Sequence, residues 1–353
     1  MNPRIKNVFR KLREQKLDGL LLSLASNISY LTEYASRDSY LLISPKENVY
    51  FTDSRYTEEA RLGLKGVATI REVNGSVFKF IAENCLSLGL KRVGFEERHL
   101  ACAEFKKIKE FLKGQAQIIG LHSLIETLRQ LKEPQEVEKM RKAIRITAQA
   151  LSFIEDFIRP GIKEVEVVGE IERFIRYHGA SDKAFDIIVA SGPNSSFPHH
   201  IPSQRKLKKN EPVLIDMGVD YQGYKCDLTR IFFLDRIKGL NLKIYDIVRE
   251  AQDRAIRKIG PGCKISEIDK ASRQYIAEKG YAERFGHNLG HGIGLDVHEA
   301  PQISSGEDVA LETGMVFTVE PGIYLPNKFG IRIEDMILVT QEGSEVLSGS
   351  IHK

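Results

Sequence analysis

The chain has 353 residues, of which 42% are hydrophobic and 28% charged, as in a globular protein with one large and one smaller domain. Its 52 basic and 48 acidic residues leave a formal charge of only +4, well short of the concentrated basic field of nucleic-acid binders. Its four cysteines lack C-x-x-C spacing, which argues against a disulfide framework or a thiolate metal site. Because no segment has the apolar pattern of a signal peptide or a membrane span, we expect a cytoplasmic protein without membrane association.

The first third of the chain alternates short apolar runs with amphipathic stretches. The apolar runs, at residues such as 19–24 and 40–43, predict strands, and the stretches 55–64 and 77–88 predict helices. This alternation indicates an α/β domain. The composition changes near residues 124–134, so we place the domain boundary at about residue 130.

The remainder of the chain groups its helices and strands. Helices are predicted at 135–158, where Pro160-Gly161 stops the first, and at 163–177, 243–259 and 265–279. Strands are predicted at 185–190, 213–219, 224–234, 316–324 and 330–339. Grouping of this kind favours an α+β domain with an antiparallel sheet.

One predicted hairpin carries two aspartates in otherwise apolar strands. Residues 213–218 lead into a polar turn that contains glycine, and residues 224–234 return as the second strand. If the loop is symmetric, with residue 219 paired to residue 224, Asp216 faces Asp227 at a Cβ separation of about 5 Å.

A second hairpin repeats the pattern near the C-terminus, where it turns at residues 326–328 and places Glu320 opposite Glu334. Opposed like charges destabilise a sheet and buried carboxylates carry a large desolvation cost, so each pair needs a cation or a shared proton. The alternatives are acids at exposed strand ends, or a bulge that parts them. Two matching hairpins favour a cation.

A glycine- and histidine-rich segment, FGHNLGHGIGLDVHE at residues 285–299, lies between the hairpins. His287 and His291 have the i, i+4 spacing of a helical zinc motif, but the repeated glycines oppose a helix and favour extended backbone packed closely against a neighbour. Prolines hold two more histidines in the loop at 198–202. A lone histidine more often has a structural role, so the clustering is what indicates ligands.

Four carboxylates with one or more imidazoles form an oxygen-rich ligand set, unlike the thiolate and histidine sets of structural zinc. Such a set favours manganese, cobalt or iron. Carboxylates in facing pairs suit a bridging role between two ions about 3.5–4 Å apart, which activate a shared water at neutral pH.

These segments resemble the pita-bread metallopeptidases, the family of Xaa-Pro aminopeptidases, prolidases, creatinases and methionine aminopeptidases. Five ordered motifs carry the resemblance: SGPNSSFPHH, IDMGVDYQGYKCDLTRIFF, FGHNLGHGIGLDVHE, TVEPGIY and GIRIEDMILV. The resemblance implies a smaller α/β creatinase-like domain at residues 1–130 and an α+β pita-bread catalytic domain at residues 131–353.

The resemblance also implies a role for each candidate site residue. Two divalent ions, with manganese favoured and cobalt, iron or zinc compatible, would be held by Asp216, Asp227, His291, Glu320 and Glu334. Glu320 would also serve as a general acid and base. Residues near the substrate, which would stabilise the oxyanion or support the ligands, are His199, His287, His298 and Arg332. His200 departs from the family, in which glycine usually follows the histidine matched by His199.

The implied activity is hydrolysis of the Xaa-Pro bond at the N-terminus of peptides, by an Xaa-Pro aminopeptidase. Methionine aminopeptidases generally lack the N-terminal domain, and creatinases lack the intact metal set. An Xaa-Pro dipeptidase is the alternative, because both activities share the motifs. A non-catalytic binding protein is the competing class, but such relatives usually lose metal ligands. The resemblance further implies a homodimer that acts on proline-containing peptides or dipeptides.

Overall fold

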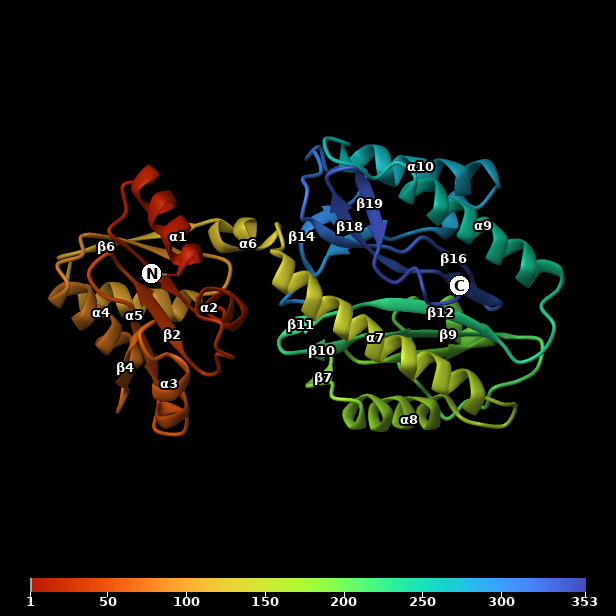
Figure 1. Ribbon diagram of the computed structural model, residues 1–353, viewed down its shortest axis with the longest axis horizontal. Helices are drawn as coiled ribbons and strands as arrows, with labels where there is room; N and C mark the ends of the chain where they lie inside the picture. The colour runs from red at the N-terminus through yellow and green to blue at the C-terminus, as the bar shows by residue number, and fades with distance from the viewer. Residues whose placement is uncertain (1) are drawn as a thin grey trace. The chain divides into compact units, whose positions relative to one another are not determined.

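The computed structural model describes residues 2–353, and the chain divides into two compact units, Met1–Arg129 and Gln130–Lys353 (Figure 1). Along residues 2–353, none of the helices combines the length and apolarity needed to cross a bilayer.

The N-terminal unit is built on a six-stranded sheet in the order β4-β3-β2-β1-β5-β6. Strand β1 pairs antiparallel with β2 and parallel with β5, so the sheet is mixed. Every residue of β1 and β3 is buried, which explains their continuous apolar runs. The elements are α1 (Pro3–Glu14), β1 (Gly19–Leu22), α2 (Ala25–Thr32), β2 (Tyr40–Ile43), β3 (Val49–Thr52), α3 (Thr57–Gly63), β4 (Thr69–Glu72), α4 (Val77–Ser87), β5 (Arg92–Glu96), α5 (Cys102–Leu112), β6 (Gln117–Leu121) and α6 (Leu124–Arg129). The predicted α/β character of this region is confirmed.

The C-terminal unit combines several antiparallel sheets with two pairs of helices. Its sheets have the strand orders β12-β9-β8, β11-β10-β7, β14-β13-β15-β18-β19 and β16-β17. Helices α7 and α8 pack together against strands that include β8 and β10, while α9 and α10 pack together against strands that include β14 and β15. In Figure 1, α9 and α10 lie along the top of this unit, α8 lies along its lower edge, and α7 crosses the view of the strands. This is the predicted α+β arrangement.

The elements of the C-terminal unit, in chain order, are α7 (Pro134–Phe157), α8 (Glu164–Tyr177), β7 (Asp182–Lys183), β8 (Ile188–Ser191), η1 (Gly192–Ser196), β9 (Pro212–Met217), β10 (Val219–Tyr221), β11 (Tyr224–Lys225), β12 (Leu228–Phe233), α9 (Gly239–Ile256), α10 (Ile265–Glu278), η2 (Ala282–Arg284), β13 (Gly290–Gly292), β14 (Glu299–Ile303), β15 (Val316–Val319), β16 (Gly322–Leu325), β17 (Phe329–Arg332), β18 (Asp335–Thr340) and β19 (Gly343–Val346).

Helix α9 buries an apolar stripe against the strands that carry the second pair of acids. The stripe has the i, i+3, i+4 spacing of a helix face and consists of Ile244, Ile247, Val248, Ala251 and Ala255. It belongs to the same core cluster as Phe317 of β15 and Ile331 of β17. Gln252, on the same helix, donates from Nε2 to the carbonyls of Val319 and Ile333. These contacts hold the backbone immediately before Glu320 and immediately before Glu334.

The predicted register of the first hairpin is wrong by two residues. Asp216 pairs with Thr229, so Asp227 lies diagonally from Asp216 rather than directly opposite it. The reason is the turn, which has only two residues, Gln222 and Gly223, both with positive φ as a type I′ hairpin requires. A shift of two residues preserves the face of the sheet, so the two aspartates still point to the same side.

The predicted register of the second hairpin is confirmed on both sides of its acids. Strands β16 and β17 pair from Leu325 opposite Phe329 to Gly322 opposite Arg332. Beyond the acids, β15 and β18 continue in the same register, with Val319 opposite Asp335.

Candidate metal centre

The structure brings the five predicted metal ligands together from two hairpins and one glycine-rich strand. Asp227, His291 and Glu334 each offer a ligand atom, and these atoms all lie within 4.8 Å of one another. His291 Nε2 lies 3.5 Å from Asp227 Oδ2 and 3.4 Å from Glu320 Oε1. Asp216 interacts with Asp227 and raises the pKa of that carboxyl after the larger effect of burial. One imidazole therefore faces a group of four carboxylates.

Glycines on both sides of His291 allow its strand to lie between β14 and β15. A Cβ atom on Gly290 would lie 1.9 Å from the carbonyl oxygen of Thr318, and one on Gly292 would lie 2.3 Å from that of Ala300. Both positions therefore exclude a side chain. The close approach confirms the predicted extended backbone in this segment, and it aims the imidazole of His291 at the carboxylates.

Among the residues that the structure describes, three buried carboxylate oxygens of this group find no hydrogen-bond partner: Asp216 Oδ1, Asp227 Oδ1 and Glu334 Oε1. Burial, followed by repulsion from neighbouring carboxylates, raises the pKa of Asp227 and of Glu334 well above its ordinary value. Buried acids with unused oxygens are costly unless a cation is bound between them. The residues present therefore fit a site for divalent metal ions.

Arg332 donates hydrogen bonds to one of the carboxylates and to two side chains beside them. Its NH2 group donates to Asp216 Oδ2 at 2.6 Å, Nε donates to Thr229 Oγ1 at 3.0 Å, and NH1 donates to Tyr324 OH at 2.8 Å. Thr229 Oγ1 in turn donates to Glu334 Oε2 at 2.7 Å. Asp216 and Glu334 thus each use one oxygen within the protein and keep the other for a ligand, the arrangement expected of residues that support a metal site.

His287 is held in one tautomer by two neighbours. Its Nδ1 donates to the carbonyl of Asn288 at 2.8 Å, so Nε2 accepts from Tyr324 OH at 3.0 Å. Burial, with a smaller effect of Arg332, lowers the pKa of His287 to about 4. The ring is therefore neutral at physiological pH and supports Tyr324 rather than contacting the carboxylates directly.

The remaining two predicted histidines lie near this group. The ring of His298 lies 4.2 Å from that of His291, centroid to centroid. Burial first, then His291 and His199, lower the pKa of His298, while His199 also lowers the pKa of His287. His199 itself is exposed. His298 therefore lies against the candidate ligand His291, and His199 is close enough to His287 and His298 to affect the pKa of both.

Comparison with known proteins agrees with this geometry. Residues 138–341 match the model of metallopeptidase family M24, and residues 4–131 match the creatinase/prolidase N-terminal domain. The chain belongs to metallopeptidase family M24. The expected pita-bread metallopeptidase fold is thus confirmed. Metallopeptidases of this family use divalent metal ions, and Asp227, His291 and Glu334 form a candidate site for them in this chain.

Similar proteins cover almost the whole chain. An uncharacterized peptidase of Bacillus subtilis, YqhT, is 36% identical over 347 residues, covering 98% of this chain and 97% of the relative. The structure of an Xaa-Pro dipeptidase from Bacillus anthracis has a TM-score of 0.94 and 38% identity, with coverage of 99% of this chain and 98% of that chain. An X-Pro aminopeptidase from Thermotoga maritima has a TM-score of 0.88 and 35% identity, with coverage of 96% and 97%.

Sequence reasoning missed two members of this M24 site, Thr229 and Tyr324. Thr229 is two residues after Asp227 on β12, so strand periodicity could have placed it on the same face. Tyr324 ends the TVEPGIY motif, but only the fold brings its hydroxyl between Arg332 and His287.

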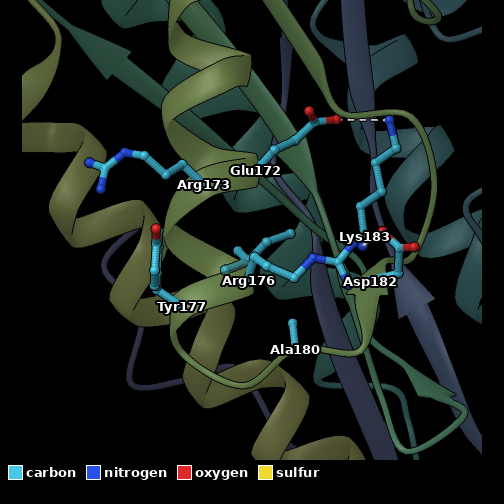
Figure 2. Close-up of a pocket in the computed structure, with 8 residues that line it drawn as sticks. Glu172, Arg173, Arg176, Tyr177, Ala180, Asp182 and Lys183 are labelled. Carbon is cyan, nitrogen blue, oxygen red and sulfur yellow. Dashed lines mark hydrogen bonds and ion pairs between the residues drawn. The ribbon is translucent and has the colours of Figure 1, made fainter.

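A separate pocket in the catalytic domain is not part of this site. It lies between the end of α8 and β7, and Figure 2 shows Lys183 reaching Glu172 across it. Lys183 Nζ lies 2.8 Å from Glu172 Oε1, and Arg176 NH2 lies 3.1 Å from Asp182 Oδ1. Because these cations are paired with acids and no predicted site residue lines the pocket, we do not assign a substrate to it.

The metal-free enzyme should lose stability as the pH rises. Raised pKa values of Asp227 and Glu334 mean that the folded protein binds more protons than the unfolded chain, whose carboxyls titrate near pH 4. The free energy of unfolding must then fall between about pH 4 and the raised folded values. Bound divalent ions offset the repulsion, so the difference in Tm between Mn²⁺-loaded and chelated protein should widen from about pH 5 to about pH 8. Calorimetry of both forms tests this, and a difference that narrows with rising pH would contradict it.

Proposed function

We propose that this M24 enzyme removes the first residue from peptides whose second residue is proline, as an Xaa-Pro aminopeptidase with two divalent ions, manganese being the favoured metal. The convergence of the five ligands carries the hydrolytic part of the proposal. The chain is similar to solved structures of peptidases, and this similarity supports peptides as its substrates. An Xaa-Pro bond needs a specialised enzyme because its nitrogen carries no hydrogen and the proline ring restricts the backbone.

The ligands in this proposal are Asp216, Asp227, His291, Glu320 and Glu334. Bound divalent ions supply Lewis acidity and activate water at neutral pH. Glu320 is the residue that moves the proton, because its side chain is 16% exposed, against 8% for Asp227, and Thr318 Oγ1 orients its Oε1 from 3.1 Å. His199 and His298 donate to the oxygen on which negative charge develops.

The burial of Arg332 and its existing hydrogen bonds favour an aminopeptidase over a dipeptidase. A dipeptidase must recognise the free carboxylate of proline, usually with a cation. The side chain of Arg332 is only 4% exposed, and it already donates to Asp216, Thr229, Tyr324 and the carbonyl of Pro198. A proline carboxylate would have to displace these partners, whereas a longer peptide makes no such demand. A dipeptidase remains the second candidate, because the chain is also similar to an Xaa-Pro dipeptidase from Bacillus anthracis.

Comparison of kcat/KM on Xaa-Pro and Xaa-Pro-Xaa with the same first residue tests the choice, because the ratio reports differential binding of the two transition states. We expect the tripeptide to be hydrolysed at least as efficiently as the dipeptide. A tripeptide value more than about tenfold lower, equivalent to about 1.4 kcal/mol, would make the enzyme a dipeptidase instead. A matched peptide with alanine in place of proline serves as the specificity control.

A further inference from the structure

A buried carboxylate anchors both ends of the loop that carries His199. Glu164, the first residue of α8, has a fully buried side chain. Its Oε1 accepts from the backbone and hydroxyl of Ser191 at 2.8 and 2.7 Å, and its Oε2 accepts from the backbone and hydroxyl of Ser203 at 3.0 and 2.7 Å. Asn194 Nδ2 donates to both oxygens, at 3.0 and 3.1 Å. Ser191 and Ser203, which flank the 192–202 loop, are therefore both bound to the carboxylate of Glu164.

His200 connects the C-terminal part of this loop to the same carboxylate. Its Nε2 lies 2.9 Å from Glu164 Oε2, and its side chain is 14% exposed, whereas the neighbouring His199 is exposed. On the other side of His199, the carbonyl of Pro198 accepts from Arg332 NH1 at 3.3 Å. The backbone is thus tied down immediately before and immediately after His199.

The charge of Glu164 makes this anchor strong. Burial by itself would raise the pKa of Glu164, but hydrogen bonds from Ser203, His200 and Ser191 outweigh it and hold that pKa below its ordinary value. The N-terminus of α8 also favours a negative charge at this position. Hydrogen bonds to an ionised group are stronger than those between neutral groups, so His200 donates to a permanent and rigid acceptor.

We propose that His200 is a positioning residue: through its hydrogen bond to Glu164 it holds the adjacent His199 in place to contact the substrate. This rests on the proposed function, in which His199 stabilises the reacting carbonyl. Without the imidazole of His200, Glu164 would hold the loop through Ser191, Asn194 and Ser203 alone.

The test is a double-mutant cycle on the metal-loaded enzyme, with His199→Ala, His200→Ala and the double variant. Metal content and Tm are measured for each. We expect His199→Ala to lower kcat/KM about 100-fold, as loss of one oxyanion donor does. His200→Ala should lower kcat/KM about tenfold, mainly through kcat, with full metal content. On a His199→Ala background the second substitution should have less than a threefold effect, because coupled residues are not additive.

A conservative variant and a control complete the design. His200→Gln places an amide donor near the position of Nε2 and should recover most of the lost rate, whereas a merely bulky residue such as leucine should not. His122→Ala removes an exposed histidine of the N-terminal unit and should leave activity unchanged.

The outcomes separate this inference from the function on which it rests. Full activity of His200→Ala, or an undiminished tenfold effect on the His199→Ala background, would overturn the positioning role while leaving the peptidase intact. Full activity of His199→Ala would overturn the substrate role of His199 and, with it, the role of His200.

Discussion

Chelation of divalent metal should abolish hydrolysis of proline-containing peptides by this enzyme, and Mn²⁺ or Co²⁺ should restore it. Within residues 2–353, one buried oxygen each of Asp216, Asp227 and Glu334 has no hydrogen-bond partner, and Arg332 pairs directly with Asp216 alone among these acids, so a bound cation is needed to offset the remaining charge. A metal ion can lower the pKa of a bound water from about 16 to about 7, and no side chain among the ligands provides an equivalent nucleophile. Peptide hydrolysis followed through chelation and stepwise metal addition measures the effect.

Metal analysis of the chelated protein is the necessary control, because a tightly held ion can survive brief treatment. Mg²⁺ and Zn²⁺ in parallel additions show which ions the oxygen-rich set accepts. Full activity in protein shown to be metal-free would rule out the proposed mechanism.

Asp227→Asn and Glu334→Gln should each lose bound metal as well as turnover. In the proposed site these two carboxylates bridge the cations, a role in which a neutral amide is poor, and both belong to the same candidate ligand group. Loss of an outer partner alone costs about 10–100-fold in metal affinity, so loss of a bridging ligand should cost more than about 100-fold. Metal titration followed by calorimetry or fluorescence gives the affinity, and kcat/KM at saturating metal gives the residual activity.

His199→Ala is the matched comparison for these two variants. Its proposed partner is the substrate, so it should keep metal while it loses turnover. Equal loss of metal in all three variants would refute the division between ligands and substrate-binding residues. Thermal unfolding of the metal-free variants shows whether each one is folded. The metal-free Asp227→Asn protein should be more stable than the metal-free wild type, because one of the mutually repelling carboxylates is removed.

The ligand positions followed from local sequence features. Acids at matching positions of apolar strands, and glycines that alternate with histidines, are patterns of side-chain periodicity, which a strand preserves along its length. The second hairpin kept its predicted register because its turn is symmetric about residue 327, and that pairing continues into β15 and β18.

The first hairpin shows where local reasoning failed. The two-residue turn at Gln222 and Gly223 needs positive φ at both positions, and a residue other than glycine, asparagine or aspartate at the first of them gives little signal. The predicted strand register, with Asp216 opposite Asp227, is therefore wrong by two residues. Both side chains still lie on one face of the sheet.

The sequence by itself therefore determined the family, the types of the candidate ligands and the strand faces on which they lie, because these depend on residue identity and short-range periodicity. Tertiary structure decided how those groups are supported. Arg332 reaches Asp216 across 116 positions of the chain, and Glu164 meets His200 across 36. Contacts of that range leave no periodic trace in the sequence, since they arise only when separate strands, helices and loops pack together. The contact of Arg332 occupies one oxygen of Asp216, and the contact of His200 ties the loop beside His199 to a buried carboxylate.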